Sequence, residues 1–554
     1  MIATTVREYN RRKRFFFAAA DNFLNAKNLN AIPDTLPALL AQRVNSVTPA
    51  LIDRGRPVSF RELAGESRCV AQGLRRLGVR PGDCIALWLP NVPAWLAAFF
   101  ACAQLGAIAV SVNTRFRSHE LADILQRARA RILIFWPEFK GIDFSGILAA
   151  CDPRALEHLK SVVVYGEAGT QTPASVLGRT AHSYMLLAGG APLLENSAAP
   201  DAGCAIFTTS GTTKAPKFVL HDQRTVLAHA SDVAGGFSLT DDSVLLLVPP
   251  LCGVFGFCSA MAALCANRPM VMAPAWDADQ AARDIVAHRV THINGTDEAA
   301  AQLLDASGEP FSNIRFFGYA AFNPAQADIV QRADARDLRL VGLYGASEIQ
   351  ALFARQDETA PVAERMLGGG RPVSPAARVR VRDPESGSVL AHGVQGELEF
   401  FAPSSRMAGY HGNPDATGEA FTADGYYRSG DLGYTRADGR FIYLARIGDA
   451  LRLGGFLVSP AEIEAVVQEA PGVAACQVVG VPGAAGLVPV AFVVLHHSAS
   501  LDEAAVIARV AGKLARYKVP VRVFAIDAFP VTPGANATKI QKGKLREMAE
   551  ALLH

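Results

Sequence analysis

A loop rich in hydroxyl side chains, residues 208–217, is the segment of this sequence best suited to bind phosphate. It follows the short apolar run Cys204–Phe207 and contains five Ser or Thr residues, one glycine and two lysines. Hydroxyl groups, backbone N–H groups near a glycine and lysine ammonium groups all donate hydrogen bonds to phosphate oxygens. The P-loop spacing G-x-x-x-x-G-K-S/T does not occur in it, so the segment is either a nucleotide loop of another kind or a solvated linker.

Three further side chains have the chemistry that would complete a nucleotide site. Tyr344 offers a flat ring on which a purine stacks, and Glu348 offers a hard oxygen ligand for Mg²⁺. Asp431 offers a carboxylate that accepts hydrogen bonds from ribose hydroxyls. The two acidic residues have an ordinary structural alternative, since Glu348 also suits a helix N-terminus and Asp431 also suits a turn.

These segments resemble the motifs of the adenylate-forming superfamily, which includes acyl-CoA synthetases, aryl-CoA ligases, luciferases and peptide-synthetase adenylation domains. Thr209–Lys217 is similar to the phosphate-binding signature T-S-G-T-T-G-x-P-K, and Tyr344–Glu348 is similar to Y-G-x-S/T-E. Further similar segments follow in family order between residues 36 and 546. Lys214 and Phe218 replace two family glycines, and a lysine at the loop tip narrows the conformational freedom of the loop.

The resemblance implies one set of residues for phosphate, one for adenine, one for ribose and one for the tunnel of a thiol acceptor. The phosphate residues are Thr209, Ser210, Gly211, Thr212, Thr213, Lys217 and Ser347, and the adenine residues are Gly318, Tyr319, Ala320, Tyr344 and Gly345. The ribose residue is Asp431, and the tunnel residues are Gly454, Gly455 and Phe456. The implied cofactors and co-substrates are ATP, Mg²⁺ and coenzyme A.

Three catalytic residues follow from the same resemblance. Glu348 corresponds to the metal ligand, and Arg446 to the arginine that reaches the nucleotide. Thr538–Lys542 is similar to T-G-K-I-Q-K, which makes Lys539 the catalytic lysine of adenylation. Lys544 is the rival assignment because it also follows a glycine, but the three residues after Lys539 favour Lys539.

A candidate acyl pocket is indicated by Pro249–Gly256, which is similar to the family segment P-L-F-H-V-F-G. Cys252 and Gly253 occupy the positions where an aromatic residue and a histidine are usual. We therefore expect a roomy apolar pocket, lined by Gly253, Phe255 and Asn294, for a medium- or long-chain fatty acid or an aromatic acid. A plain turn between a strand and a helix is the structural alternative.

The elements that would position these residues are indicated by alternating hydrophobic patterns. Helical spacing at 60–77, 92–105 and 120–130 alternates with apolar runs at 84–89, 107–112 and 131–136. This alternation predicts a parallel sheet covered by helices. Residues 166–201, rich in Gly, Ala, Ser and Pro, are interpreted as a loose connection. Asp438-Gly439 between two apolar runs predicts a hairpin turn.

The length of 554 residues is too great for one hydrophobic core and predicts at least two domains. We expect an α/β fold with a large N-terminal adenylation domain, residues 1–447, of parallel-sheet βα layers and a small barrel-like β subdomain. The resemblance implies that residues 448–554 form a small mobile α+β domain that carries Lys539 and turns about a hinge at Gly448.

Charge and cysteine content limit the classes of partner. With 54 basic and 52 acidic residues, the net charge of +2 gives no electrostatic case for nucleic-acid binding. Nine cysteines without a C-x-x-C pair fit reduced thiols in a cytoplasmic protein. We expect no transmembrane segment, because Gln104–Gly106 interrupts the apolar run 95–112. Peripheral membrane contact through the basic arm Arg11–Arg14, and a homodimer, stay open.

The sequence thus predicts an ATP-dependent carboxylic acid:CoA ligase that forms an acyl-adenylate and then a thioester. One alternative is an enzyme that loads the acyl group onto the pantetheine of a carrier protein. The other is a non-catalytic acyl- or nucleotide-binding homologue, suggested by four departures from the family pattern: Lys214, Phe218, Gly448 and Thr538.

Overall fold

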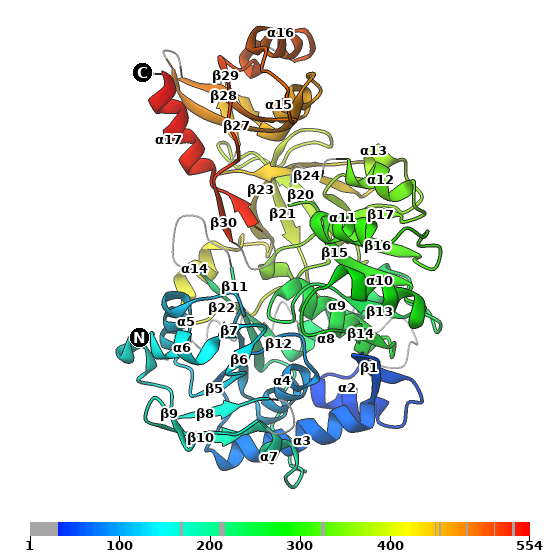
Figure 1. Cartoon of the computed structure of the whole chain (residues 1–554), viewed down its shortest axis with the longest axis vertical. Helices are drawn as coiled ribbons and strands as arrows, with labels where there is room; N and C mark the ends of the chain where they lie inside the picture. The colour runs from blue at the N-terminus through cyan, green and yellow to red at the C-terminus, as the bar shows by residue number, and fades with distance from the viewer. Residues whose placement is uncertain are drawn as a thin grey trace.

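The computed structural model describes residues 32–166, 170–209, 216–322, 326, 328–448, 450–453, 456–483, 486–514, 516–533 and 538–553. Within this part of the chain, two large sheets and their helices form the main body, and a smaller lobe follows near the C-terminus (Figure 1).

The first sheet has nine described strands in the order β22-β12-β11-β4-β3-β5-β8-β10-β9. Strands β11, β4, β3, β5, β8 and β10 run parallel, whereas β12 returns antiparallel to β11, with β22 beyond it. The strands are β3 (Cys84–Trp88), β4 (Ile108–Ser111), β5 (Ile132–Phe135), β8 (Ser161–Val164), β9 (Ser175–Val176), β10 (Arg179–Ser183), β11 (Gly203–Thr208), β12 (Phe218–Asp222) and β22 (Gly409–Tyr410).

The second sheet has 13 described strands in the order β2-β1-β14-β13-β15-β16-β17-β18-β19-β24-β23-β21-β20. It is parallel from β1 to β17 and antiparallel from β17 to β20, and this antiparallel half is the predicted β subdomain. The strands are β1 (Pro49–Asp53), β2 (Arg56–Ser59), β13 (Leu245–Leu247), β14 (Met270–Met272), β15 (His292–Thr296), β16 (Phe316–Ala320), β17 (Leu340–Tyr344), β18 (Ala354–Arg355), β19 (Gly369–Pro372), β20 (Arg378–Arg382), β21 (Gly396–Phe401), β23 (Tyr427–Thr435) and β24 (Phe441–Arg446).

Helices α4 and α9 form the centre of the main body, since both are buried on nearly every side. Their side chains share one core cluster with residues of both sheets, such as Phe207 of β11 and Leu343 of β17. Helix α4 begins with a proline and ends at Gly106 with a φ of 68°, the left-handed conformation that favours glycine at a helix end. The helices of the main body are α2 (Leu36–Arg43), α3 (Phe60–Arg76), α4 (Pro93–Leu105), α5 (Ser118–Arg127), α6 (Phe144–Ala149), α7 (Tyr184–Ala188), α8 (Gln223–Gly236), α9 (Val254–Cys265), α10 (Ala278–Ala287), α11 (Asp297–Ala306), α12 (Ile329–Asp334), α13 (Val362–Arg365) and α14 (Pro414–Glu419).

The C-terminal lobe has its own sheet and its own hydrophobic clusters. It lies beside β24 in Figure 1, where the Ser459 hydroxyl donates a hydrogen bond of 3.4 Å to the Leu444 carbonyl. Its elements are β25 (Leu451–Leu453), β26 (Phe456–Val458), α15 (Pro460–Gln468), β27 (Val473–Gly483), β28 (Gly486–Leu495), α16 (Glu503–Lys513), β29 (Arg522–Ala525), β30 (Val531–Pro533), β31 (Thr538–Ile540) and α17 (Lys542–Leu553).

The α/β fold class predicted from the alternating patterns is confirmed, and most predicted elements lie within two or three residues of the observed ones. The predicted loose connection 166–201 is wrong in part, because it contains β9, β10 and α7. Strand β10 pairs with β8, and the Tyr184 ring at the start of α7 is buried beside Tyr165. The many small residues of segment 166–201 give little hydrophobic pattern, which is why the sequence did not predict these elements. The boundary predicted at residue 448 stays a prediction.

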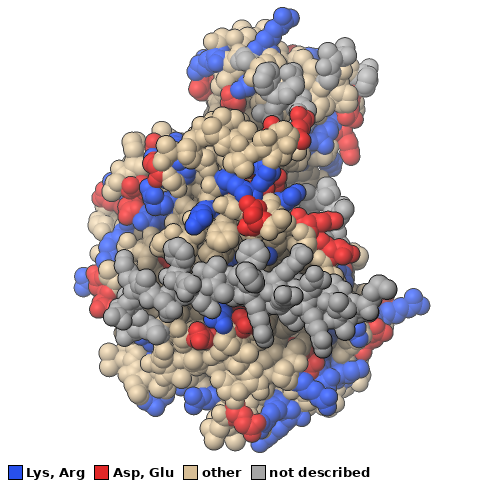
Figure 2. All heavy atoms as spheres, turned by 180° about the vertical axis from the view of Figure 1, so that it is seen from behind, with Lys and Arg blue, Asp and Glu red and all other residues tan. Residues whose placement is uncertain are grey.

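Lys and Arg side chains lie among Asp and Glu side chains over the face drawn in Figure 2, in keeping with the net charge of +2. Among the residues that the structure describes, no helix combines the length and the apolarity needed to cross a bilayer.

Candidate active site

The base of the predicted phosphate loop is closed by two hydrogen bonds between its ends. The Thr209 N–H donates to the Lys217 carbonyl at 3.0 Å, and the Lys217 N–H donates to the Thr209 hydroxyl at 3.1 Å. Ser210, Gly211, Thr212 and Thr213 lie outside the described residues. The two flanking strands, β11 and β12, therefore hold the ends of the loop in one fixed register.

Phe218, one of the two residues that replace a family glycine, belongs to a strand rather than to the loop. It is the first residue of β12 and pairs with Thr208, and its side chain is buried. The Arg127 guanidinium lies 4.3 Å from the centre of its ring, in cation–π contact, and also donates to the Pro216 carbonyl at 2.7 Å. The bulk of Phe218 is thus accommodated in the core beside the loop.

Glu348 follows β17 in a short 3-10 turn, Ser347–Ile349, and its side chain is buried. The Tyr410 hydroxyl donates to Glu348 Oε1 at 2.8 Å, and the Met407 N–H donates to the Glu348 carbonyl at 2.8 Å. Among the described residues, no donor contacts the second oxygen, Oε2. One oxygen of this carboxylate is therefore held while the other stays available.

The donor set around Glu348 fits Mg²⁺ that is shared with a nucleotide. The described part of the chain holds no cluster of three or more His, Cys, Asp or Glu side chains that could bind a metal ion unaided. Mg²⁺ is commonly bound by one or two carboxylates together with substrate phosphates and water. A single carboxylate near a phosphate loop is that arrangement.

Asp431 and Arg446 face each other across an antiparallel strand pair, in register on β23 and β24. Asp431 is 3% exposed, and Arg446 Nη1 lies 3.0 Å from its Oδ1. That contact is an ion pair without hydrogen-bond alignment, since Nη1 donates instead to the Ser429 carbonyl and Oδ1 has no hydrogen-bond partner among the described residues. The Tyr344 hydroxyl donates to the other oxygen at 2.5 Å. Asp431 thus keeps one buried acceptor for a hydroxyl group.

Burial controls the ionisation of this carboxyl group. It raises the pKa of Asp431 to about 6, although Arg446 and the Tyr344 hydroxyl both oppose the shift. Burial and the neighbouring Asp431 raise the pKa of Tyr344 well above its ordinary value, so the phenol stays a donor at neutral pH.

Tyr344 is itself fixed by aromatic neighbours. Its ring stacks on Phe400 at 5.1 Å with an interplanar angle of 29° and meets Phe441 edge-on at 5.2 Å. The adjacent Gly345 has no room for a side chain, because an added Cβ would lie 2.7 Å from the Cα of Ala351. The turn that carries Glu348 therefore packs tightly against its own return segment.

The second predicted adenine segment lies on β16, which is the direct neighbour of β15, the strand of Asn294. Gly318 is in register with Asn294, and an added Cβ would lie 2.6 Å from Asn294 Oδ1. The Tyr319 side chain is buried in the core, and its hydroxyl donates to the Met366 carbonyl at 3.1 Å. Ala320 ends the strand, half-buried. Since the Tyr319 ring packs in the core, it is not free to stack on a base, and the backbone and the half-buried Ala320 are what this segment can offer.

The predicted acyl-pocket residues lie on α9 and β15. Gly253 precedes the first residue of α9, and Phe255 is buried in its first turn. The Asn294 amide donates to the Ser259 hydroxyl at 3.2 Å, which in turn donates to the Phe255 carbonyl at 3.0 Å. This chain of hydrogen bonds links β15 to the first turns of α9, so Asn294 is connected through Ser259 to the backbone of Phe255.

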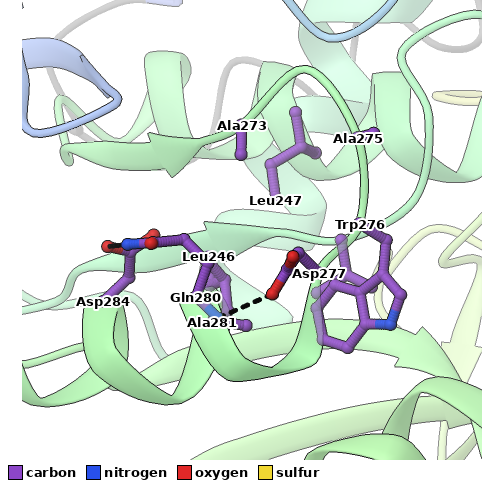
Figure 3. A pocket seen from close by; sticks show the side chains of 10 residues that line it. Leu246, Leu247, Ala273, Ala275, Trp276, Asp277, Gln280, Ala281 and Asp284 are labelled. Atoms are coloured by element: carbon purple, nitrogen blue, oxygen red, sulfur yellow. Dashed lines mark hydrogen bonds between the residues drawn. The ribbon is translucent and has the colours of Figure 1, made fainter. Parts of the chain in front are cut away.

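A small cavity of about 20 Å³ lies near the C-terminal ends of β13 and β14 (Figure 3). It is lined by Leu246, Leu247, Trp276 and Gln280, among others. This volume holds roughly one water molecule, so the cavity is not the acyl site.

The C-terminal candidates are described only in part. Lys539 lies on β31, where its backbone pairs with Thr532 of β30, but its side chain is outside the described atoms. The same holds for the Phe456 side chain, and Gly454 and Gly455 lie outside the described residues altogether. Gly448 lies in the turn after β24, where an added Cβ would meet nothing within 4 Å.

Comparison with protein families identifies the family of this chain. The model of the AMP-binding enzyme family matches residues 41–411, and the model of the C-terminal domain of AMP-binding enzymes matches residues 462–535. The chain belongs to the AMP-binding enzyme family.

Two curated relatives of this AMP-binding enzyme are named as CoA ligases. A methyl-dioxo-octahydroindenyl-propanoyl:CoA ligase of Mycobacterium tuberculosis is 31% identical over 94% of this chain and 99% of its own length. A sulfoacetate–CoA ligase of Cupriavidus necator is 31% identical over 94% and 99%. The crystal structure of ATP-bound MatB from Rhodopseudomonas palustris superposes with a TM-score of 0.79, at 26% identity, over 94% of this chain and 100% of that one.

Some residues that build the site were not assigned by sequence reasoning. Asn91 holds the segment predicted to border the acyl pocket, since its amide donates to the Pro249 carbonyl at 3.2 Å and its Oδ1 accepts from the Leu251 N–H at 2.7 Å. His221 contacts the Ser347 carbonyl through Nε2 at 2.8 Å, and burial lowers its pKa to about 4. Asn91 could have been suspected from the sequence, because it is a polar residue between a predicted strand and a predicted helix. The sequence around His221 contains no pattern that predicts its contact.

Proposed function

We propose that this protein is an ATP-dependent carboxylic acid:CoA ligase that proceeds through an acyl-adenylate. The supporting observation is that three predicted site residues lie close to one another. Arg446 forms an ion pair with Asp431, and Glu348 is near enough to Asp431 to raise its pKa. Tyr410 contacts both Glu348 and Lys217, which links this group to the base of the predicted phosphate loop. The CoA-ligase names of the two curated relatives support the same activity.

The first half-reaction joins the acid to AMP. One oxygen of the substrate carboxylate bonds to the α-phosphorus of ATP, and the bond from that phosphorus to the bridging oxygen of pyrophosphate breaks. The attack brings like charges together, so hydrogen-bond donors aimed at the phosphates accelerate it. Each such donor lowers the activation free energy by about 3 kcal/mol. Glu348 would hold Mg²⁺, which when bound neutralises charge on the phosphate oxygens.

The nucleotide would be oriented by the Asp431 region. The partnerless Oδ1 of Asp431 is suited to accept a hydrogen bond from a ribose hydroxyl. Arg446 lies within 3.0 Å of the same oxygen with about half of its side chain exposed, so its guanidinium can also reach the nucleotide. Ser347 and the hydroxyls of the loop supply further donors to phosphate.

The second half-reaction transfers the acyl group to a thiol. The thiol sulfur of CoA bonds to the acyl carbon, AMP leaves with the former carboxylate oxygen, and the thiol proton passes to solvent. We propose that the C-terminal lobe turns about Gly448 between the two steps, withdrawing Lys539 and presenting Gly454 and Gly455. In support, Gly448 lies in an open turn, where an added Cβ would have no neighbour within 4 Å, and hinges are a few loop residues that absorb large changes of backbone angle.

The acid is proposed to be a medium- or long-chain fatty acid or an aromatic acid. Gly253, the residue before α9, has no side chain to fill the proposed pocket that Phe255 and Asn294 would line. The acids named for the two curated relatives differ widely in size, so family membership alone does not fix the substrate. A cytoplasmic location and a homodimer stay predictions.

Pyrophosphate release measured with a panel of acids, with and without CoA, tests this function. We expect AMP and pyrophosphate to form with at least one acid, and mass spectrometry to detect its CoA thioester. Adenylate without thioester would favour a carrier-protein acceptor. Binding of ATP without any pyrophosphate release across the panel would favour the non-catalytic homologue.

A further inference from the structure

Tyr410 lies between the phosphate-loop lysine and the candidate metal ligand. Its hydroxyl donates to Glu348 Oε1 at 2.8 Å, and the Lys217 ammonium lies 4.6 Å from the centre of its ring. The side chain is 6% exposed, at the end of β22, whose neighbour in the sheet is β12. One aromatic ring thus contacts two groups that would act on the same triphosphate.

The backbone on both sides of Tyr410 is fixed to the strand that leaves the phosphate loop. The Ala408 N–H donates to the Leu220 carbonyl and the His411 N–H donates to the Phe218 carbonyl, both at 2.8 Å. The Tyr410 N–H donates to the Thr417 hydroxyl, also at 2.8 Å. The ring therefore has a fixed position relative to Lys217, which lies just before β12.

The two contacts of Tyr410 strengthen each other. A phenol that donates a hydrogen bond to a carboxylate carries more negative charge on its ring, and a more negative ring attracts a cation more strongly. An ionised carboxylate only accepts hydrogen bonds, so the Tyr410 hydroxyl is the donor of this pair. Without the hydroxyl, Glu348 Oε1 would lose its described side-chain donor.

We propose that Tyr410 is a positioning residue that holds Glu348 and Lys217 at a fixed separation, so that the metal ligand and the loop cation address one triphosphate. The inference rests on the proposed function, because it presumes that ATP binds with Mg²⁺ here. A purely structural role would instead be filled by the ring alone, which packs in the hydrophobic cluster around Tyr344 and Phe400.

Calorimetric titration with ATP, in the presence of Mg²⁺ and again in the presence of a chelator, tests this proposal on the full chain. Tyr410→Phe keeps the ring and removes the hydroxyl, so we expect the preference for Mg²⁺–ATP over metal-free ATP to fall about tenfold. Affinity for metal-free ATP should change less than about twofold. Tyr410→Leu removes both contacts and should also weaken metal-free ATP about two- to fivefold, because Lys217 loses its ring.

Tyr426→Phe is the matched control, since that ring lies under Arg380 at 3.7 Å and contacts neither Glu348 nor Lys217. Its affinities for Mg²⁺–ATP and for metal-free ATP should equal those of the wild type. A metal preference in Tyr410→Phe equal to that of the control would overturn the proposal, as would equal loss of metal-free binding in Tyr410→Phe and Tyr410→Leu. If leucine perturbs folding, Tyr410→Phe alone keeps the test decisive, because it retains the ring and its metal preference can still be compared with that of the control. Wild-type protein that binds Mg²⁺–ATP but releases no pyrophosphate would contradict the proposed function and leave this inference standing.

Discussion

At the scale of single residues, the site depends on carboxylates that are buried but incompletely satisfied. Asp431 has one oxygen bound by the Tyr344 hydroxyl and one without a hydrogen-bond partner in the described structure. Glu348 has one oxygen bound by Tyr410. A buried acceptor without a donor is unfavourable in the free protein, and a bound nucleotide would relieve it. Such residues are expected where a ligand completes the structure.

Asp431 should make the stability of the protein depend on pH. Because folding raises its pKa from about 4 to about 6, the native state keeps a proton that the unfolded chain has lost between these pH values. The carboxyl group therefore destabilises the fold above pH 6 and not below pH 4. Asp431→Asn should raise the free energy of unfolding at pH 8, relative to that at pH 4.5, by on the order of 2 kcal/mol.

Urea unfolding of the wild type and Asp431→Asn at the two pH values measures this difference. Asp305→Asn, at a position that is 77% exposed, is the control and should leave the difference unchanged. An Asp431→Asn profile parallel to that of the wild type would show that the buried carboxyl group does not carry the shift.

Lys539 is predicted to act in adenylation alone. Lys539→Ala should lower acid-dependent pyrophosphate release about a hundredfold or more, because one donor to the reacting phosphate is lost. Thioester formation from supplied acyl-adenylate and CoA should stay near the wild-type rate. Lys544→Ala, the rival assignment, should spare both steps, and a reversal of the two phenotypes would move the catalytic role to Lys544.

At the scale of elements, strand pairing brings the site together. Asp431 meets Arg446 because β23 and β24 pair in that register, and Tyr410 meets Glu348 because β22 adds to β12 at the sheet edge. Gly318 allows β16 to lie beside Asn294 of β15. Contacts of this kind follow from register rather than from local sequence.

Gly318→Ala tests the closeness of β15 and β16. The added methyl group would lie 2.6 Å from Asn294 Oδ1 and 2.8 Å from the Phe316 ring, so neighbouring groups must move. We expect a loss of about 1–3 kcal/mol in the free energy of unfolding. Gly308→Ala, where an added Cβ meets nothing within 4 Å, should change stability by less than about 0.5 kcal/mol. Equal effects of the two substitutions in urea unfolding would contradict the packing described.

The sequence predicted elements and residue types better than their mutual contacts. The helix α4 and its flanking strands followed from apolar runs, whereas the roles assigned to Glu348, Asp431 and Arg446 come from family motifs and stay predictions. The contact of Tyr410 with Glu348 could not be predicted, because no local pattern shows that β22 pairs with β12. The hairpin of β9 and β10 was missed because small residues carry little hydrophobic signal there.

At the scale of the whole molecule, the proposed two-step reaction requires two arrangements of the C-terminal lobe. The observed arrangement does not itself require glycine at position 448, because an added Cβ has open space and the φ angle is outside the left-handed region. The glycine would then serve the rotation or the second arrangement, in which other φ values are needed.

Gly448→Ala should therefore leave stability and the first half-reaction nearly unchanged and slow thioester formation. Pre-steady-state measurement of pyrophosphate and then of acyl-CoA separates the two steps, and we expect about a threefold or larger loss in the second step alone. Gly512→Ala, another position with no neighbour within 4 Å, is the control. Equal rates of thioester formation in both variants would show that the lobe does not turn about residue 448.

Isotope exchange between labelled pyrophosphate and ATP reports whether this chain activates a carboxylic acid as an acyl-adenylate. With Mg²⁺ and a substrate acid, and without any thiol, label should appear in ATP at a rate that depends on the acid and is lost in Lys539→Ala. Label that enters ATP equally well without an acid, or never enters it with any member of a broad acid panel, would contradict the account.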